Sequence, residues 1–472
     1  MRYLTLLSSA LLLAACGGSS LEFPEQEPDP TPGTGSEILE IIHASPDAPD
    51  VDVVLDGTTI AEGAPYKAGL VLQSPAESIS LGVLGLVPDE NDPSPLALSR
   101  DPVIEADLDT PEGTRVTVFA ANTVSDIEPI VVTAPIEEVP SDSVRLRVVH
   151  AAPIFDPEMV SVFLTGPDEE LDAPTETFAF GSDFGPVTVP ANDYRIRITP
   201  AGDTSTVLFD SGTVELPGGA DLVVAAVVSA LPEVPLSLLV ADGQGVSELI
   251  DDRAQSTVRV VHAAPAAPNV DVILNDSLPP AISDLAFTEF TERLPIDAGE
   301  YNVKVVPTAS DVEPAAVEGD VAPIEAVIDE DVVLVAGEEY SVYALGIDPL
   351  QALPLVDDNR RINTEARLRI VHGAPSAGDV DIYLAPSDAE LDAPALAAVP
   401  FAAESGYLSV APGNYDIRVV PAGGDPLTPA IGPLPVVFTA GGIYTVVARD
   451  AAGGGDPFGV ILLDDLDAAS SH

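Results

Sequence analysis

The sequence predicts an all-β protein made of four tandem antiparallel β-sandwich domains that follow a disordered tether. Two observations indicate this fold class. A His-containing segment recurs four times, about 110 residues apart, which is the length of a complete small domain. Between these segments hydrophobic and polar residues alternate, and the chain holds 36 Gly and 47 Pro residues, as expected of short strands joined by turns.

The composition excludes several classes of protein. With 46% hydrophobic residues the chain can form packed cores, so it is not wholly disordered. It carries 77 Asp and Glu against 18 Lys and Arg, a formal net charge of −59, which argues against nucleic acid as a partner because phosphate contacts need basic residues. The same excess predicts a fold that added salt stabilises by screening self-repulsion. A single Cys excludes intrachain disulfides and zinc sites built on several thiolates.

The first 15 residues predict a signal peptide. Arg2 precedes an apolar stretch over residues 4–13, which is too short to span a bilayer. The segment LAAC, ending at Cys16, resembles the lipobox of bacterial lipoproteins, and this resemblance implies cleavage before Cys16 and acylation of that residue. Because Gly17 rather than Asp follows, the same resemblance implies anchoring at the outer membrane or cell surface. A secretory signal with a chance Cys is the alternative.

Residues 16–36 are predicted to be an acylated Cys followed by a disordered tether. Their sequence, CGGSSLEFPEQEPDPTPGTGS, lacks strand alternation and places Pro among acidic residues, so it cannot bury enough apolar surface to fold. No later segment approaches the roughly 18 consecutive apolar residues of a membrane span. The lipid on Cys16 is therefore expected to be the only membrane attachment of an exported protein.

Each of the four copies begins with a strand-like segment that ends in His and Pro. In chain order these segments contain ILEIIHASP, RLRVVHAAP, VRVVHAAP and RLRIVHGAP. In the second copy Leu146, Val148 and His150 would point to one side. Arg147 and Val149 would point to the other side, which is predicted to face water. The predicted domains span residues 37–140, 143–252, 256–360 and 365–467.

A second strand and a later hairpin recur in the same order in the copies. The second strand reads VDVVLDG, VSVFLTG, VDVILND and VDIYLAP. The hairpin combines turn residues that tolerate positive φ with an alternating run that starts at Tyr194, Tyr301 and Tyr415. The first copy lacks this Tyr and is the most divergent.

The repeated motifs resemble a known bacterial family. The pattern R-h-R-V-V-H-A-x-P, followed by V-D-V-x-h and L-P-A-G-x-Y (h is hydrophobic), is similar to the family called domain of unknown function 4397. The resemblance extends over four copies and is most specific in the third and fourth. It implies immunoglobulin-like domains in a secreted or surface-anchored protein. It carries no catalytic residue over to this chain.

The repeated His residues could serve the fold or bind a ligand. They are His43, His150, His262 and His372. One imidazole per domain cannot form a metal cluster unless domains associate, and no nucleophile recurs beside it. We expect the ring to hydrogen-bond the backbone of the turn after the strand, and a ligand role is the alternative.

Acidic residues two positions apart in the second strand could supply oxygen ligands to calcium. They are Asp50 with Asp52, Asn269 with Asp271, and Asp379 with Asp381, whereas the second copy has Glu158 and Ser161 in this region. No segment matches an EF-hand loop. A solvated strand edge is the expected role of these residues, and calcium binding is the alternative.

The predicted function is that of a non-enzymatic surface module. A lipid-anchored rod of sandwich domains would bind or adhere to an unknown surface protein or polymer. No catalytic residue, cofactor or metal ligand is expected. A structural spacer of the envelope and a hydrolase of surface polymers are the alternatives. Residues 89–110 are the best candidate for a ligand loop, and ordinary turn chemistry is the other interpretation of this segment.

Overall fold

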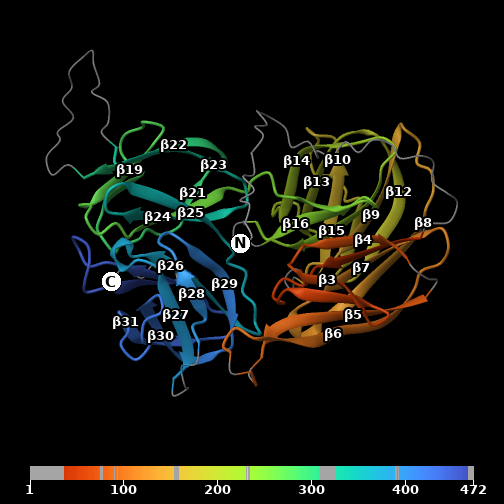
Figure 1. Ribbon diagram of the computed structural model, residues 1–472. Helices are drawn as coiled ribbons and strands as arrows, with labels where there is room; N and C mark the ends of the chain where they lie inside the picture. The colour runs from red at the N-terminus through yellow and green to blue at the C-terminus, as the bar shows by residue number, and fades with distance from the viewer. Residues whose placement is uncertain are drawn as a thin grey trace, which may run out of the picture.

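The computed structural model describes residues 37–465 except 75–77, 90, 93, 154–158, 230, 232–233, 309–325, 388–390 and 392. The predicted signal peptide, Cys16 and the tether lie outside the described residues. Strands, loops and two short 3-10 helices make up the described chain (Figure 1). The predicted all-β fold is confirmed.

The strands form four successive groups, which we call modules 1 to 4. Module 1 contains β1 (Ile38–His43), β2 (Val51–Leu55), β3 (Thr58–Ala64), β4 (Gly69–Gln73), β5 (Ser78–Pro88), β6 (Leu98–Asp109), β7 (Thr114–Ala121), the helix η1 (Val124–Asp126) and β8 (Glu128–Pro135). Module 2 contains β9 (Ser143–His150), β10 (Met159–Thr165), β11 (Glu176–Ala179), β12 (Asp183–Pro190), β13 (Asn192–Pro200), β14 (Phe209–Leu216), β15 (Asp221–Val228), β16 (Leu236–Ala241) and β17 (Val246–Leu249).

The C-terminal half repeats this series of strands. Module 3 contains β18 (Ser256–His262), β19 (Val270–Leu274), β20 (Ile282–Leu285), β21 (Leu294–Ile296), β22 (Gly299–Pro307), β23 (Ile328–Leu334), β24 (Glu339–Gly346) and β25 (Leu350–Asp357). Module 4 contains β26 (Ala366–Gly373), the helix η2 (Pro375–Ala377), β27 (Val380–Pro386), β28 (Leu396–Val399), β29 (Glu404–Val410), β30 (Gly413–Pro421), β31 (Ile431–Phe438), β32 (Ile443–Arg449) and β33 (Gly459–Asp464).

Each module is a sandwich of two sheets, so the predicted repeated β-sandwich architecture is confirmed. One sheet, which we call the inner sheet, contains the first strand of the module. The inner sheets have the orders β4-β1-β7-β8, β12-β9-β15-β16-β17, β21-β18-β24-β25 and β29-β26-β32-β33. The outer sheets have the orders β3-β2-β5-β6, β11-β10-β13-β14, β20-β19-β22-β23 and β28-β27-β30-β31.

The sheets are antiparallel apart from one central pair in each inner sheet. The first strand of every module runs parallel to its seventh strand. This order differs from that of an immunoglobulin constant domain, whose sheets hold strands ABED and CFG. Parallel neighbours need a long connection, and here the intervening strands, which include the whole outer sheet, provide it.

The modules pack in pairs through their inner sheets, with modules 1 and 2 on one side of Figure 1 and modules 3 and 4 on the other. The shared buried clusters include Ile42, Phe119, Val149 and Val223 in the first pair, and Val261, Tyr343, Val371 and Val447 in the second. The predicted rod is therefore wrong, because neighbouring modules lie face to face rather than end to end.

Pairing also buries the face of the first strand that was expected in water. Val149 is fully buried against module 1, so the prediction of one wet face is wrong. A strand that is covered on both faces reads as a continuous apolar run. The segment DLVVAAVV of β15, buried at all but its ends, shows this pattern.

The connection between modules 3 and 4 also contacts module 1. Arg360 donates to the carbonyl of Ala48 at 2.7 Å. Asn363 donates to the carboxylate of Asp47 at 2.6 Å. These contacts link the two module pairs into one body.

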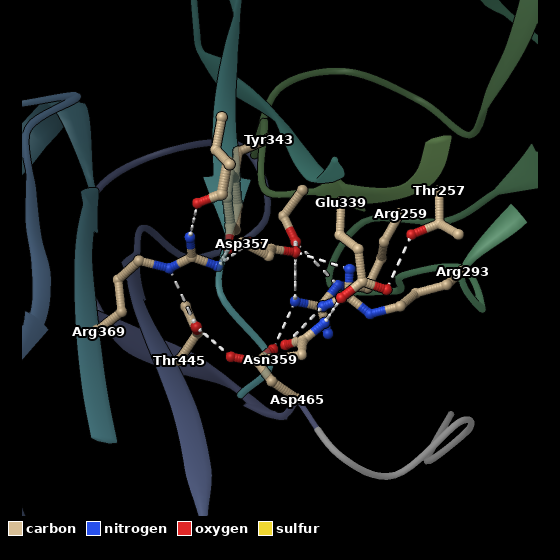
Figure 2. A network of polar contacts seen from close by, with 12 residues as sticks. Thr257, Arg259, Arg293, Glu339, Tyr343, Asp357, Asn359, Arg369, Thr445 and Asp465 are labelled. Carbon is tan, nitrogen blue, oxygen red and sulfur yellow. Dashed lines mark hydrogen bonds and ion pairs between the residues drawn. The ribbon is translucent and has the colours of Figure 1, made fainter. Parts of the chain in front are cut away.

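Reciprocal ion pairs lie between the inner sheets of modules 3 and 4 (Figure 2). Arg259 of module 3 donates to Asp465 of module 4 at 2.5 Å. In return, Arg369 of module 4 donates to Asp357 of module 3 at 2.6 Å. Each Arg lies three residues before the repeated His of its module, so the contact has the pseudo-twofold character of an isologous dimer interface.

Hydroxyl groups complete this ionic network. The hydroxyls of Ser341 and Thr445 donate to Asp357 and Asp465 at 2.6 and 2.7 Å. Burial alone would raise the pKa of Asp357, but the guanidinium of Arg369 holds that pKa below its usual value. A buried network of this kind adds little net stability when it is complete, and removing one member is costly.

Asp357→Asn is expected to destabilise modules 3 and 4 by about 3 kcal/mol or more, because it leaves Arg369 buried without its counter-charge. Asp276→Asn is the matched control, since it removes the carboxylate of a half-exposed pair with Lys304 and should cost less than about 1 kcal/mol. Urea unfolding followed by circular dichroism measures both changes. Equal, small effects would contradict the role given to the buried network.

Candidate functional site

Three of the four repeated His side chains fix the loop that follows the first strand. In module 1, Nε2 of His43 donates to the carbonyl of Pro49 at 3.0 Å, and Nδ1 accepts the N–H of Ser45 at 3.4 Å. His262 and His372 make the same two contacts, to the residues two and six positions further on. The expected structural role is confirmed at these three positions.

His150 lies at the same position in module 2, but its imidazole nitrogens have no hydrogen-bond partner among the described residues. Residues 154–158, which follow in the sequence, lie outside the described chain. The imidazole packs instead against Phe178 and Phe180, with ring centroids 6.4 and 6.3 Å apart. Burial lowers the pKa of His150 to about 4, so its ring is neutral at pH 7.

His43→Gln is expected to flatten the dependence of stability on pH between 6.5 and 4. Burial lowers the pKa of His43 to about 4 in the folded state, whereas the unfolded chain binds the proton near pH 6.5. The neutral ring of His43 therefore adds about 3 kcal/mol to the free energy of unfolding above pH 6.5, and this stabilisation is lost as the pH falls to 4.

Thermal unfolding of the wild type and of His43→Gln at pH 7.0, 5.5 and 4.5 measures this contribution, on the order of a few kcal/mol. Burial raises the pKa of Glu365 to about 7, so this residue makes the fold more stable as the pH falls. That effect opposes the effect of His43 and is the same in the wild type and the variant. The informative quantity is therefore the difference between the two slopes. Identical slopes would show that His43 does not titrate differently in the folded state.

The acidic residues considered as calcium ligands hold the neighbouring edge strand in the structure. Asp52 and Asp381 are buried, so the expected solvated strand edge is wrong for these two residues. Asp52, Asp271 and Asp381 each accept a backbone N–H from the adjacent edge strand, β3, β20 or β28. Both carboxylate oxygens of Asp381 accept backbone N–H groups, at 2.8 Å. No group of three or more His, Cys, Asp or Glu residues in the described ranges could hold a metal ion. Glu158 lies outside those ranges.

Residues 89–110 were the candidate for a ligand loop, and the expectation of a loop is wrong for residues 98–109. Most of the segment is the long strand β6, which pairs along β5. Its alternating residues Ile104, Ala106 and Leu108 contribute to the core of module 1, so the segment is required for packing.

The structure contains a site that no sequence motif indicates, an apolar cavity of about 380 Å³ between the two sheets of module 3. The inner sheet contributes Val258 and Val342, and the outer sheet contributes Val272, Val303 and Ile328. A volume of this size falls within the range of small-molecule binding sites.

Module 3 is hollow because its inward-facing residues are smaller than those of its neighbour. Strand register identifies the equivalent positions. Val258, Val303 and Ala352 lie where module 2 has Leu146, Ile196 and Leu238. The corresponding space in module 2 is about 50 Å³. Each missing methylene costs about 1 kcal/mol of packing, so the cavity lowers the stability of module 3.

The cavity reaches the surface at the two adjoining edge strands β23 and β25. Val333 and Val356 line it and are 49% and 56% exposed. Apolar surface therefore continues from the cavity to the outside. Glu330 and Asp331 also line it, and no lining residue is basic.

The sequence indicates this cavity through the size of its core residues, although no motif indicates it. In the third copy, Val258 replaces the Leu found at the same position of the second and fourth copies. Glu330 replaces Leu434 of the fourth copy, as the pairing of each with its neighbouring strand shows. Comparison of core volumes between copies would have indicated a hollow module, whereas a search for catalytic or metal-binding motifs could not.

These features define a tandem β-sandwich protein with a small-molecule-sized cavity in one module. Residues 38–161 and 256–383, more than half of the chain, match the family described as domain of unknown function (DUF4397). The chain belongs to this family. Both matched regions begin with the first module of a pair and end in the second strand of the next module, β10 or β27. A comparison with curated proteins gives no match. Within the described ranges no helix is long and apolar enough to cross a membrane.

Proposed function

We propose that this chain is an exported, lipid-anchored protein of the bacterial cell envelope that binds an apolar small molecule in the cavity of module 3 without catalysing a reaction. The observation that carries this proposal is the cavity itself. Among the described residues, the core cluster of module 3 has seven buried members, whereas that of module 2 has seventeen. The space lies within a complete sandwich and is lined mainly by Val, Leu and Ile, as expected for an apolar ligand.

The lining supports binding over hydrolysis. Among the described residues it contains no Ser, Thr, Cys, His or Lys, so it offers no Ser, Thr or Cys nucleophile beside a His or Lys base. The two phenol groups in the lining belong to Tyr301 and Tyr340, and each already has a backbone partner. The pairwise packing of the modules argues against a spacer, because it shortens the reach of the chain.

The proposed location rests on the N-terminal sequence. The signal-like segment ends at Cys16, and 20 residues rich in Pro, Gly and acidic side chains separate that Cys from the first described residue, Glu37. Such a tether would hold the four modules away from the membrane. We thus propose a small molecule as the ligand, in place of the surface protein or polymer expected from the sequence.

Filling the cavity is expected to abolish binding of the neutral probe N-phenyl-1-naphthylamine and to raise the melting temperature by a few degrees. The variant combines Val258→Leu, Val303→Ile and Ala352→Leu, which are the residues of module 2. The full chain with Cys16→Ser is the background, so that no detergent competes for the site. Leu146→Val in module 2 is the control and should lower stability by about 1 kcal/mol without changing probe binding. Unchanged binding by the filled variant would refute the site.

Cys16→Ser is expected to abolish lipid attachment when the full chain is expressed in a bacterium, because the thiol that accepts the lipid is lost. Mass spectrometry of the N-terminal peptide and partition into Triton X-114 measure this change. Leu21→Ser, in the tether, is the control and should leave acylation intact. An unmodified, processed N-terminus in the wild type would contradict the proposed anchor.

A further inference from the structure

We infer that the ligand of module 3 is an apolar organic cation, in which a hydrophobic body carries an ammonium group. This inference rests on the proposed binding function and specifies the chemical class of the ligand. It is carried by the placement of the carboxylate of Glu330, which has no protein partner among the described residues, at the opening of a mainly apolar cavity.

Glu330 occupies a core-facing register position on the edge strand β23, and its side chain is exposed where the cavity opens to the surface. Strand β23 alternates Ile328, Glu330, Val332 and Leu334 along the face whose apolar members line the cavity. Glu330 pairs with Val303 across the sheet, and Leu434 pairs with Ile417 at the same point of module 4. A side chain at this position is therefore placed to meet whatever fills the space between the sheets.

The carboxylate of Glu330 has no hydrogen-bond or ion-pair partner among the described residues. Lys304, the basic residue of the neighbouring strand β22, is engaged elsewhere, since it donates to Asp276 at 2.6 Å. The acidic neighbours of Glu330 on β23 are held on the outer side, where Asn302 donates to both at 2.9 and 3.0 Å. An unpaired carboxylate next to an apolar cavity favours a ligand that brings a positive charge.

The aromatic lining is suited to the same ligand. The hydroxyl of Tyr301 donates to the carbonyl of Asp297 at 2.9 Å, and that of Tyr340 accepts the N–H of Val335 at 3.3 Å. With the hydroxyls engaged, the rings are the part of each Tyr that remains for a ligand. Aromatic rings attract ammonium groups.

The charge of the whole chain acts in the same direction. A formal net charge of −59 raises the local concentration of cations and repels anions. A fatty acid would have to place its carboxylate beside that of Glu330, whereas an ammonium ion would neutralise it. The cavity therefore discriminates by charge as well as by apolar volume.

Titration calorimetry with octylammonium, octanol and octanoate at pH 7 tests this inference, since the three probes share one alkyl chain. The full chain with Cys16→Ser is the protein. Octylammonium is expected to bind about tenfold more tightly than octanol, and octanoate more weakly than either. Glu330→Gln should reduce the affinity for octylammonium to that for octanol. Glu300→Gln removes an exposed carboxylate of β22 that does not line the cavity, and should retain the preference.

The possible outcomes separate this inference from the proposed function. If the three probes bind equally, or if Glu300→Gln and Glu330→Gln weaken octylammonium equally, the inferred cation site is wrong while the apolar site stands. If no probe binds, the proposed function itself fails. If octylammonium also binds the filled variant, its binding lies outside the cavity and the inference is overturned.

Discussion

The burial of one apolar sheet face against its counterpart in the next module is the interaction on which the structure depends. It turns four similar sandwiches into two four-layered pairs, each with a third core between the modules. The inner sheets are consequently the most buried parts of the chain. This arrangement makes the pair, rather than the single module, the unit that repeats, and the two family matches begin at the first strand of each pair.

The same packing explains how module 3 can be hollow and still ordered. Its inner sheet has a second apolar face, where Val261 and Tyr343 are fully buried against module 4. The inner-sheet strands that line the cavity on one face are therefore held in place by contacts with module 4 on their other face. Apolar burial between modules offsets part of the packing that the cavity lacks. The binding site and the stability of the module come from opposite faces of one sheet.

The sequence predicted the strands and the repeat well because both depend on local patterns. The alternation of hydrophobic and polar residues, the turn residues and the recurring His depend only on residues that are close in the sequence. Pairing of modules depends on contacts between distant residues, so Val149 was taken for a residue facing water although it is fully buried. Arg259 and Arg369, in the first strand of their modules, resemble exposed residues in the sequence, and their counter-charges lie in the other module of the pair. The cavity depends on summed side-chain volume, which no single motif encodes.

The first pair differs from the second in the chemistry at its centre. Where module 3 has Arg259, module 1 has Glu40, which accepts from Arg115 at 2.8 Å and from the backbone N–H of Gly243 in module 2 at 2.9 Å. In the same packing geometry, module 3 in the place of module 1 would set Arg259 opposite Gly243, which has no side-chain anion, in place of Asp465. The central charges therefore favour the observed pairs over this alternative pairing.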